Sequence, residues 1–466
     1  MTECHYPVHP YIPNMAPTNR QQMLQELGIS SPEDLFADVP PHLRVKGLLD
    51  LPQPLLSEYD LYRHTKRILV QNKTCADYLS FLGGGCWQHY VPAVCDEINS
   101  RGEFLTAYTG DTYQDHGRWQ ALFEFASLMG ELLNMEIVSV PTYDWGQAAA
   151  TSIRMAQRIT GRGEVLVASV TAPERLCIMA GYCGPSATIR TVPHDPATGL
   201  LLPDEFEKAI SESTAAVYFE NPSYLGVIQG RAPEIAEMAH GRGALCIVGA
   251  DPISLGVLAP PADYGADIVC GDLQPLGIHM NYGGGLSGFI ASHDEPRFVM
   301  EFPTRLVGIT QTTVEGEHGF GEVAFYRTSF IEREQGKEYV GTGTSLWAIT
   351  AGVYLALLGP QGMKQIGEAI LQRTQYAKGR LGQVPGVRVP ASAAPSFKEF
   401  VVDFNGTGKT VAQVNKALLG HGIFGGKDLT QEFPALGQSA LFCVTEIHTK
   451  QDIDRLAACL EEVVAS

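Results

Sequence analysis

Several features that define large protein classes are missing from this sequence. Lys and Arg number 33 against 51 Asp and Glu in 466 residues, which gives a formal charge of −18 at pH 7. A nucleic-acid partner is therefore not expected, because binding to phosphate backbones requires a basic surface. The longest apolar stretch, residues 345–359, is shorter than the roughly 18 residues that would indicate a membrane span. It predicts a buried helix and no membrane partner.

Targeting and metal-binding signals are also missing. The N-terminal residues contain no basic segment followed by an apolar run, so we expect no signal peptide and a cytoplasmic protein. The ten cysteines include no C-x-x-C pair, the spacing typical of zinc and redox sites. Cys246, Cys270 and Cys443 lie inside apolar runs. We therefore expect reduced thiols packed as small hydrophobic side chains, with no metal site.

Short apolar runs alternate with helical segments between about residues 130 and 330. The runs lack the polar alternation of half-exposed strands, as expected for strands buried on both faces of a sheet. Helical segments at 203–213 and 232–243 complete βαβ units, which predict a mostly parallel sheet covered by helices. The five predicted strands are residues 163–169, 215–221, 244–251, 266–272 and 284–292.

The remaining segments predict an arm and a smaller domain around this α/β domain. Residues 1–65 are rich in proline and polar residues, with one helical segment at 31–39, and are expected to lie across the rest of the protein or a neighbouring subunit. The large α/β domain is predicted at 66–345 and linking helices at 346–385. Residues 386–466 predict strand, helix, strand and helix, a small C-terminal α+β domain.

This layout is typical of fold-type I pyridoxal phosphate (PLP) enzymes, which need a phosphate cradle at a helix N-terminus, an acid for the pyridinium nitrogen and a lysine for the Schiff base. Residues 143–158 supply a glycine-containing turn before a helix of small residues. The alternative is an ordinary helix capped by Asp144. Asp251 follows an apolar strand, the position of a pyridinium partner; the alternative is a turn or cap residue.

The expected lysine is missing. No lysine lies between Lys208 and Lys337. That region includes residues 271–285, where a fold-type I enzyme would carry its Schiff-base lysine. Without the amine, the chain cannot form the usual covalent link to PLP. Either the chain is not a PLP enzyme, or it completes a site whose lysine belongs to another chain.

Distinctive sequence motifs occur in order along almost the whole chain. They are HPYIPN (9–14), ELGISSPEDLFADVP (26–40), FLGGGCWQHYVPAV (81–94), FLTAYT (104–109), YFENPSYLGVI (218–228), ADPISLGVLAPPADYGADIVCGDLQPLGI (250–278), TRLVG (304–308), GVYLALLG (352–359), GIFGGKDL (422–429) and CVTEIHTKQDIDRL (443–456). In these runs the chain resembles the α subunits (subunit 1) of two-subunit bacterial glycine dehydrogenase (decarboxylating), the P-protein of the glycine cleavage system.

The resemblance implies a fold-type I large domain without a cofactor lysine. PLP would be bound by a homologous β subunit (subunit 2) in an α/β or α2β2 assembly, and this chain would not be active alone. The implied reaction releases CO2 from glycine and passes the aminomethyl group to the lipoyl arm of H-protein. The lack of lysine between residues 208 and 337 fits this division of labour.

The resemblance also implies four catalytic candidates. Tyr108 and Thr109 match the FLTAYT run, Tyr113 follows in the next loop, and His89 lies in CWQHYVP. The Tyr108 hydroxyl would reach the partner's cleft to orient the amino acid or the PLP. The alternatives are a buried aromatic residue for Tyr108 and a structural histidine for His89.

Three further residues occupy positions that contact the cofactor in a PLP-bearing subunit. Asn221 lies in ENPSYLG, Asp251 follows its strand, and Gln274 stands in the region that would hold the lysine. In a chain without that lysine these are vestigial cofactor-binding positions. The alternative is that they now hold the pocket together by hydrogen bonding.

Three segments depart from the family's usual sequence and leave the identity of the substrate undecided. Residues 110–117 replace a run like PYQPEISQG, residues 332–346 replace an ERATSNICTNQ-like run, and YDWGQAA (143–149) stands where YDGATA is typical. Two alternatives therefore accompany the glycine decarboxylase interpretation. The chain is a diverged paralogue that decarboxylates another small amino acid or derivative with a β-like partner, or it is a non-catalytic stabilising subunit.

Overall fold

The protein is described by a computed structural model over residues 11–12, 16–45, 47, 49–105, 116–328, 331, 333–334, 336–338, 340, 343–390 and 394–465. Its contacts divide the chain into two compact units, Met1–Lys73 and Thr74–Ser466. The boundary predicted at 65/66 falls within helix α2 (Glu58–Leu69), ahead of the division at 73/74. The boundaries predicted inside the second unit stay predictions.

The first unit contains α1 (Pro17–Leu27), the 3-10 helices η2 (Pro32–Phe36) and η3 (Pro41–Leu43), and α2. The helical segment predicted at 31–39 is the short 3-10 helix η2. Ser31 caps it by accepting the N–H of Glu33, as the Ser-Pro start of this segment favours. None of these four helices has a buried residue, so the unit builds no core from them.

The second unit is built on a seven-stranded sheet with strand order β2-β8-β7-β6-β5-β3-β4. Strands β4, β3, β5, β6 and β7 are parallel, and β8 and β2 are antiparallel to their neighbours. The five predicted strands are present, and the mostly parallel sheet is confirmed. They are β3 (Glu164–Ala168), β5 (Thr214–Glu220), β6 (Leu245–Gly249), β7 (Ile268–Asp272) and β8 (Gly288–Ser292); β2 (Ile137–Val138) and β4 (Thr188–Val192) are not predicted by the sequence.

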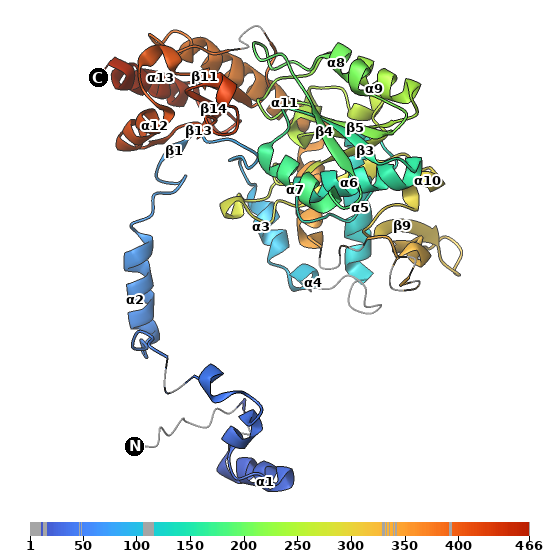
Figure 1. Cartoon of the computed structure of the whole chain (residues 1–466), viewed down its shortest axis with the longest axis vertical. Coiled ribbons are helices and arrows are strands. Elements are labelled where there is room, and N and C mark those ends of the chain that lie inside the picture. The colour runs from blue at the N-terminus through green and yellow to red at the C-terminus, as the bar shows by residue number, and fades with distance from the viewer. Residues whose placement is uncertain are drawn as a thin grey trace. The chain divides into compact units, whose positions relative to one another are not determined.

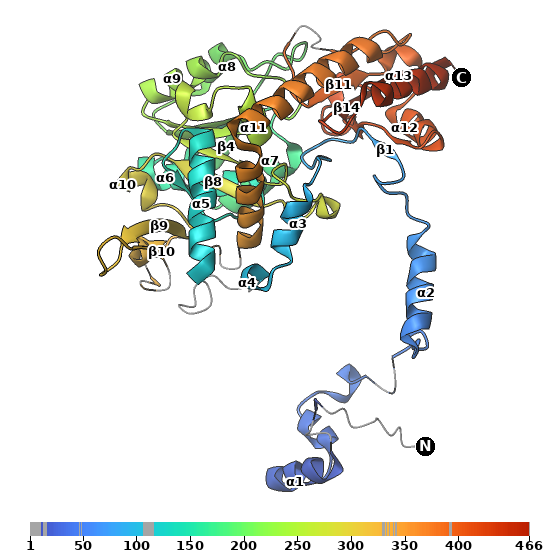
Figure 2. The ribbon, with the colours of Figure 1, turned by 180° about the vertical axis from the view of Figure 1, so that it is seen from behind.

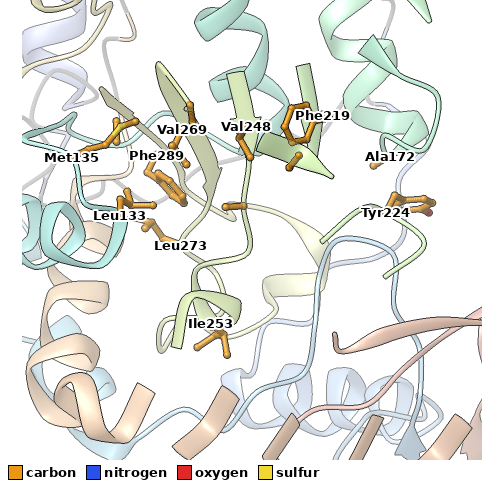
Figure 3. Packing of buried hydrophobic residues seen from close by; sticks show 14 of the residues in the cluster. Leu133, Met135, Ala172, Phe219, Tyr224, Val248, Ile253, Val269, Leu273 and Phe289 are labelled. Atoms are coloured by element: carbon orange, nitrogen blue, oxygen red, sulfur yellow. The ribbon is translucent and has the colours of Figure 1, made fainter. Parts of the chain in front are cut away.

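Alternate residues of each strand point to opposite faces of this sheet. Helices cover both faces because the residues on both are apolar. Val217, Val248 and Val269 pack on the side of α5 (His116–Leu133), α9 (Ala232–Gly241) and α11 (Ser345–Leu381). Tyr218, Ile247 and Ile268 pack on the side of α6 (Trp145–Thr160) and α7 (Pro173–Cys183). Figure 3 shows the first cluster, in which Leu133 and Met135 lie beside Phe289.

Helix α11 joins two helices that the sequence predicts separately, at 345–359 and 363–381. It kinks at Gly359, where φ is +58°, next to Pro360. Of the helices that the structure describes, it alone is long and apolar enough to cross a membrane. Ala348, Ala351 and Tyr354 of its first half are nevertheless buried in the core, where α11 runs beside α5 (Figure 2). The predicted buried helix is confirmed.

The C-terminal residues form a second sheet with its own apolar core. We call β11 (Glu399–Asp403), β14 (Ser439–Cys443) and β13 (Lys427–Asp428) the C-terminal sheet; its strands are antiparallel in that order. Helices α12 (Val411–Gly420) and α13 (Lys450–Ala465) accompany it (Figure 1). The predicted strand-helix-strand-helix order is present, and β1 (Leu79–Ser80) pairs with β12 (Ile423–Phe424) beside it.

A hairpin that the sequence does not predict follows the large sheet: β9 (Leu306–Gln311) pairs with β10 (His318–Val323). The shorter elements of the second unit are α3 (Ala93–Asn99), α4 (Gly102–Leu105), α8 (Pro203–Ala209), α10 (Pro296–Val299), η4 (Pro252–Gly256), η5 (Pro261–Tyr264), η6 (Asn281–Gly283), η7 (Phe325–Arg327), η8 (Asn405–Thr407) and η9 (Pro434–Leu436). Cysteines 95, 183, 246, 270, 443 and 459 are buried, as the prediction of packed thiols requires, whereas Cys177 is exposed and Cys75 and Cys86 are half-buried.

Candidate functional site

Three buried carboxylates lie where parallel strands of the large sheet end. Glu220 is the last residue of β5, Asp251 follows β6, and Asp272 is the last residue of β7. In open α/β sheets, ligands bind beyond the carboxyl ends of the strands. This edge, facing the C-terminal sheet, is therefore the candidate functional site.

Glu220 is neutralised by an arginine from α7. Arg175 Nε and Nη2 donate to the two carboxylate oxygens at 2.7 and 2.8 Å, and Tyr218 Oη donates at 3.1 Å. The guanidinium also lies 4.1 Å from the ring centroid of Trp145. Burial alone would lower the pKa of Arg175, but the attraction of Glu220 raises it above its ordinary value. The pair is a buried ion pair that links β5 and α7.

The predicted phosphate cradle is an ordinary capped helix start. Asp144 Oδ1 accepts the N–H of Gln147 at 2.7 Å, and Asp272 Oδ1 accepts the N–H of Trp145 at 2.6 Å. Burial raises the pKa of Asp272 to about 8. The indole Nε1–H of Trp145 donates to Tyr218 Oη at 3.1 Å. The chain's own carboxylates therefore take N–H groups of the first turn of α6 that a phosphate would need.

Asp251 lies where the sequence predicts, and its partner is a lysine of the same chain. Lys398 Nζ lies 2.6 Å from Asp251 Oδ2, and the two side chains are 2% and 7% exposed. The same ammonium is 4.1 Å from the centroid of the Trp87 ring. Asp251 Oδ1 also accepts the N–H of Ile253 at 3.1 Å and so caps η4. These contacts favour the alternative of a cap residue, and the role of a pyridinium partner stays a prediction.

The glycine-rich run at 81–90 joins both sheets at this site. Gly84 N–H donates to Glu399 Oε1 at 2.6 Å. His89 Nδ1 lies 2.7 Å from Glu446 Oε2, and the N–H of Tyr90 donates to Glu446 Oε1 at 2.7 Å. Burial alone would raise the pKa of Glu446, but the attraction and hydrogen bond of His89 and the N–H of Tyr90 lower it to about 2. Glu446 is therefore a carboxylate at neutral pH.

A second lysine links the C-terminal sheet to the rim of the site. Lys427 Nζ donates to Tyr224 Oη at 2.6 Å and pairs with Glu174 at 2.8 Å and Glu432 at 2.9 Å. A Cβ added at Gly84 would lie 2.7 Å from Lys427 Cδ, so the run at 81–90 approaches this lysine closely. Lys398, which precedes β11, thus places a positive charge at the carboxylate edge of the large sheet. Lys427 of β13 places a second one at the rim of the site.

The other predicted site residues have their own hydrogen bonds. Asn221 Oδ1 accepts the N–H of Gln229 at 2.9 Å, and its Nδ2 donates to Tyr264 Oη at 3.3 Å. Gln274 Nε2 donates to the Trp87 carbonyl at 2.9 Å, and its Oε1 accepts the Trp87 N–H at 3.2 Å. These contacts favour the alternative in which the vestigial positions hold the pocket together. Tyr108, Thr109 and Tyr113 lie outside the described residues.

Comparison with known proteins identifies the family. The family model of the glycine cleavage system P-protein matches residues 9–460. The probable glycine dehydrogenase (decarboxylating) subunit 1 of Staphylothermus marinus is 37% identical over 98% of both chains, and that of Brevibacillus brevis is 37% identical over 96% of this chain and 97% of its own. This chain belongs to the glycine cleavage system P-protein family. The resemblance seen in the sequence is confirmed.

Solved structures agree with this membership. A crystal structure of glycine decarboxylase (P-protein) of the glycine cleavage system, in an inhibitor-bound form, superposes with a TM-score of 0.84 at 35% identity, over 98% of this chain and 99% of that one. A NifS-like protein matches with a TM-score of 0.63 at 12% identity, over 83% of this chain and 99% of its own, and this likeness concerns the fold alone. The predicted fold class, with a fold-type I large domain, is confirmed for this P-protein chain.

PLP does not fit the residues at this edge of the P-protein chain. Its pyridinium subsite at Asp251 holds Lys398, and Trp145 with Arg175 takes up the start of α6. What remains is a cavity of about 20 Å³, room for about one water molecule. No lysine stands at the end of β7, where Asp272 is followed by Leu273 and Gln274. We call this edge the filled pocket.

Sequence reasoning misses the residues that fill the pocket. Trp145 is visible in the sequence as a departure, since YDWGQAA stands where the family usually has YDGATA. The position of its indole, however, depends on Gly249, because a Cβ at that residue would lie 2.9 Å from the indole. Lys398 and Glu446 carry no local pattern, because their partners Asp251 and His89 lie far away in the sequence. His89 is found by the sequence, and its burial against Glu446 favours the structural alternative.

Proposed function

We propose that this chain is the α subunit of a two-subunit, PLP-dependent glycine decarboxylase and that a homologous β subunit carries the PLP. The filled pocket is the observation that supports this division most directly, because Lys398, Trp145 and Arg175 occupy the space that a cofactor would need. Relatives of similar length are named subunit 1, and a name of this kind implies a second subunit. The pair would assemble as α/β or α2β2 in the cytoplasm.

The proposed reaction releases the carboxylate of glycine as CO2 and transfers the aminomethyl group to the lipoyl arm of H-protein. We propose that this chain contributes Tyr108, Thr109 and Tyr113, which follow α4 in the sequence and whose hydroxyls would orient the amino acid in the partner's cleft. His89 would position the run at 81–90 beside the same cleft, because it and the N–H of Tyr90 both bind Glu446. Asn221, Asp251 and Gln274 would stabilise the filled pocket.

Carboxyl-labelled glycine tests the proposal. Label release as CO2 is measured for this chain, for the β subunit, and for the two mixed, each with PLP and lipoylated H-protein. We expect rapid release from the mixture alone, together with the mass increase of an aminomethyl group on H-protein. Equal release by the β subunit without this chain, or release by this chain alone, would contradict the proposal.

A diverged substrate is the second candidate function. It rests on the altered segments. Two described residues of 332–346 form ion pairs: Glu338 pairs with Arg154 and Arg158 of α6, and Lys337 pairs with Glu301. A panel of carboxyl-labelled small amino acids, given to the same mixture, separates the two candidates. Release from glycine alone excludes the paralogue, and release from another amino acid without glycine turnover excludes the glycine assignment.

A purely stabilising subunit makes a different prediction for Tyr108. If its hydroxyl orients the substrate, Tyr108→Phe lowers kcat of the mixture by at least about tenfold while the complex still assembles. Tyr182→Phe on α7 is the control, since this tyrosine is 37% exposed and belongs to no proposed site. Unchanged kcat in Tyr108→Phe, with assembly verified by size-exclusion chromatography, would favour the stabilising role.

A further inference from the structure

We propose that Lys398 is a built-in cation: its ammonium occupies the subsite that Asp251 would otherwise offer to a pyridinium nitrogen, and the resulting ion pair holds the C-terminal sheet on the large sheet. The subsite therefore takes a primary ammonium group. This inference concerns the residues of this chain and does not depend on which subunit binds PLP or on the substrate.

The geometry around the ammonium is that of a cation site. Nζ lies 2.6 Å from Asp251 Oδ2 and 4.1 Å from the Trp87 ring centroid, with the Phe397 ring 5.9 Å away. A carboxylate on one side and an aromatic face on another are the two features that bind an alkylammonium ion. Both charged side chains are almost fully buried, at 2% and 7% exposure. Water therefore cannot replace either partner without opening the pocket.

Backbone hydrogen bonds hold residues 395–399 in this position. The N–H of Ile228 donates to the Pro395 carbonyl and that of Phe397 to the Gly226 carbonyl, both at 2.9 Å. On the other side, the N–H of Val444 in the C-terminal sheet donates to the Lys398 carbonyl at 2.8 Å. Lys398 itself has a φ of +64°, a conformation that costs free energy in a residue other than glycine. The segment thus joins the two sheets, and of its two buried titratable side chains, Lys398 and Glu399, Lys398 is the one that pairs with Asp251.

A buried charge without its partner destabilises a protein strongly, whereas a neutral replacement of both partners is well tolerated. The ion pair therefore predicts an asymmetry. Removing Lys398 alone should loosen the C-terminal sheet, because the buried Asp251 is left without its cation. Neutralising Asp251 at the same time should restore most of the contact between the sheets.

The test uses the full-length chain with Lys398→Ala and chemical rescue. We measure amide hydrogen exchange in β11, with β3 of the same molecule as internal reference, and the unfolding temperature. Lys398→Ala should speed exchange in β11 at least about 100-fold and lower Tm. n-Propylammonium, which supplies the deleted carbons and the ammonium group, should restore both in a saturable manner. n-Propanol, its neutral analogue, should not.

Two further variants keep the proposal falsifiable. The double variant Asp251→Asn/Lys398→Met should fold and exchange in β11 within about tenfold of the wild type, even if Lys398→Ala is insoluble. Lys450→Ala, which removes an exposed pair with Asp454 on α13, is the control and should leave β11 unchanged. Unchanged exchange in Lys398→Ala, or equal rescue by n-propanol, would overturn the proposal. So would a double variant whose amide exchange in β11 is as fast as that of Lys398→Ala.

Discussion

At the scale of single residues, three largely buried carboxylates in and beside the filled pocket have partners. Glu220 has Arg175, Asp251 has Lys398, and Glu446 has His89 with the N–H of Tyr90. Such pairs add little compared with well-packed apolar residues, but breaking one leaves a charge in a medium of low dielectric constant. The pairs therefore make the pocket intolerant of single substitutions.

Arg175→Met should destabilise the second unit by about 3–5 kcal/mol, because the buried Glu220 is left without the cation that it pairs with. Urea unfolding followed by tryptophan fluorescence measures the effect. Arg231→Met is the matched control: it breaks an exposed pair with Glu234 and should leave the unfolding midpoint nearly unchanged. If Arg175→Met is as stable as the wild type, the Arg175–Glu220 pair does not support the pocket.

Glu446 predicts a pH dependence of stability. Its pKa is about 2 in the folded protein, below the value of about 4.3 of a free glutamate. The stability it contributes is therefore present above about pH 4.3 and is lost as the pH falls toward 2; the difference corresponds to about 3 kcal/mol. Glu446→Gln should lower stability at neutral pH and flatten its fall between about pH 5 and pH 3. Urea unfolding across this range checks both, and an equally steep fall in the variant would contradict the role of Glu446.

At the scale of elements, the sequence predicts what local pattern controls. The five apolar runs of the large sheet, the helices between them and the strand-helix order of the C-terminal residues follow from composition and periodicity. The antiparallel direction of β8 and the hairpin of β9 and β10 do not, because direction and pairing depend on contacts made across the sheet. The kink that merges two predicted helices into α11 is signalled by Gly359 and Pro360.

The junction between the two sheets depends on a glycine. Gly226, in the ENPSYLG run, has a φ of +81°, and a Cβ there would overlap the carbonyl of Glu399 in β11. Gly226→Ala should therefore cost at least about 3 kcal/mol or prevent folding. Gly408→Ala is the matched control: its φ is +72° and nothing lies within 4 Å of the added Cβ. It should cost only about 1 kcal/mol. Equal unfolding midpoints for the two variants would show that the close approach to β11 is unimportant.

At the scale of the whole molecule, one chain keeps the architecture of a PLP enzyme and uses the cofactor's space for its own side chains. The sequence predicts the absence of the Schiff-base lysine and the position of Asp251, since both are visible in the linear order of residues. It does not predict the occupants of the pocket, because Lys398, Trp145 and Arg175 meet only after the C-terminal sheet and α7 have packed against the large sheet.

The most direct measurement is PLP binding by the purified chain, followed by visible absorbance and equilibrium dialysis, alone and then mixed with the β subunit. The account predicts neither retained PLP nor the absorbance of a PLP–lysine Schiff base, at about 420 nm, for this chain alone. Both should appear in the mixture. Stoichiometric PLP with that absorbance on this chain alone would contradict the account, because it would require a lysine and a pocket that the filled edge of the sheet does not provide.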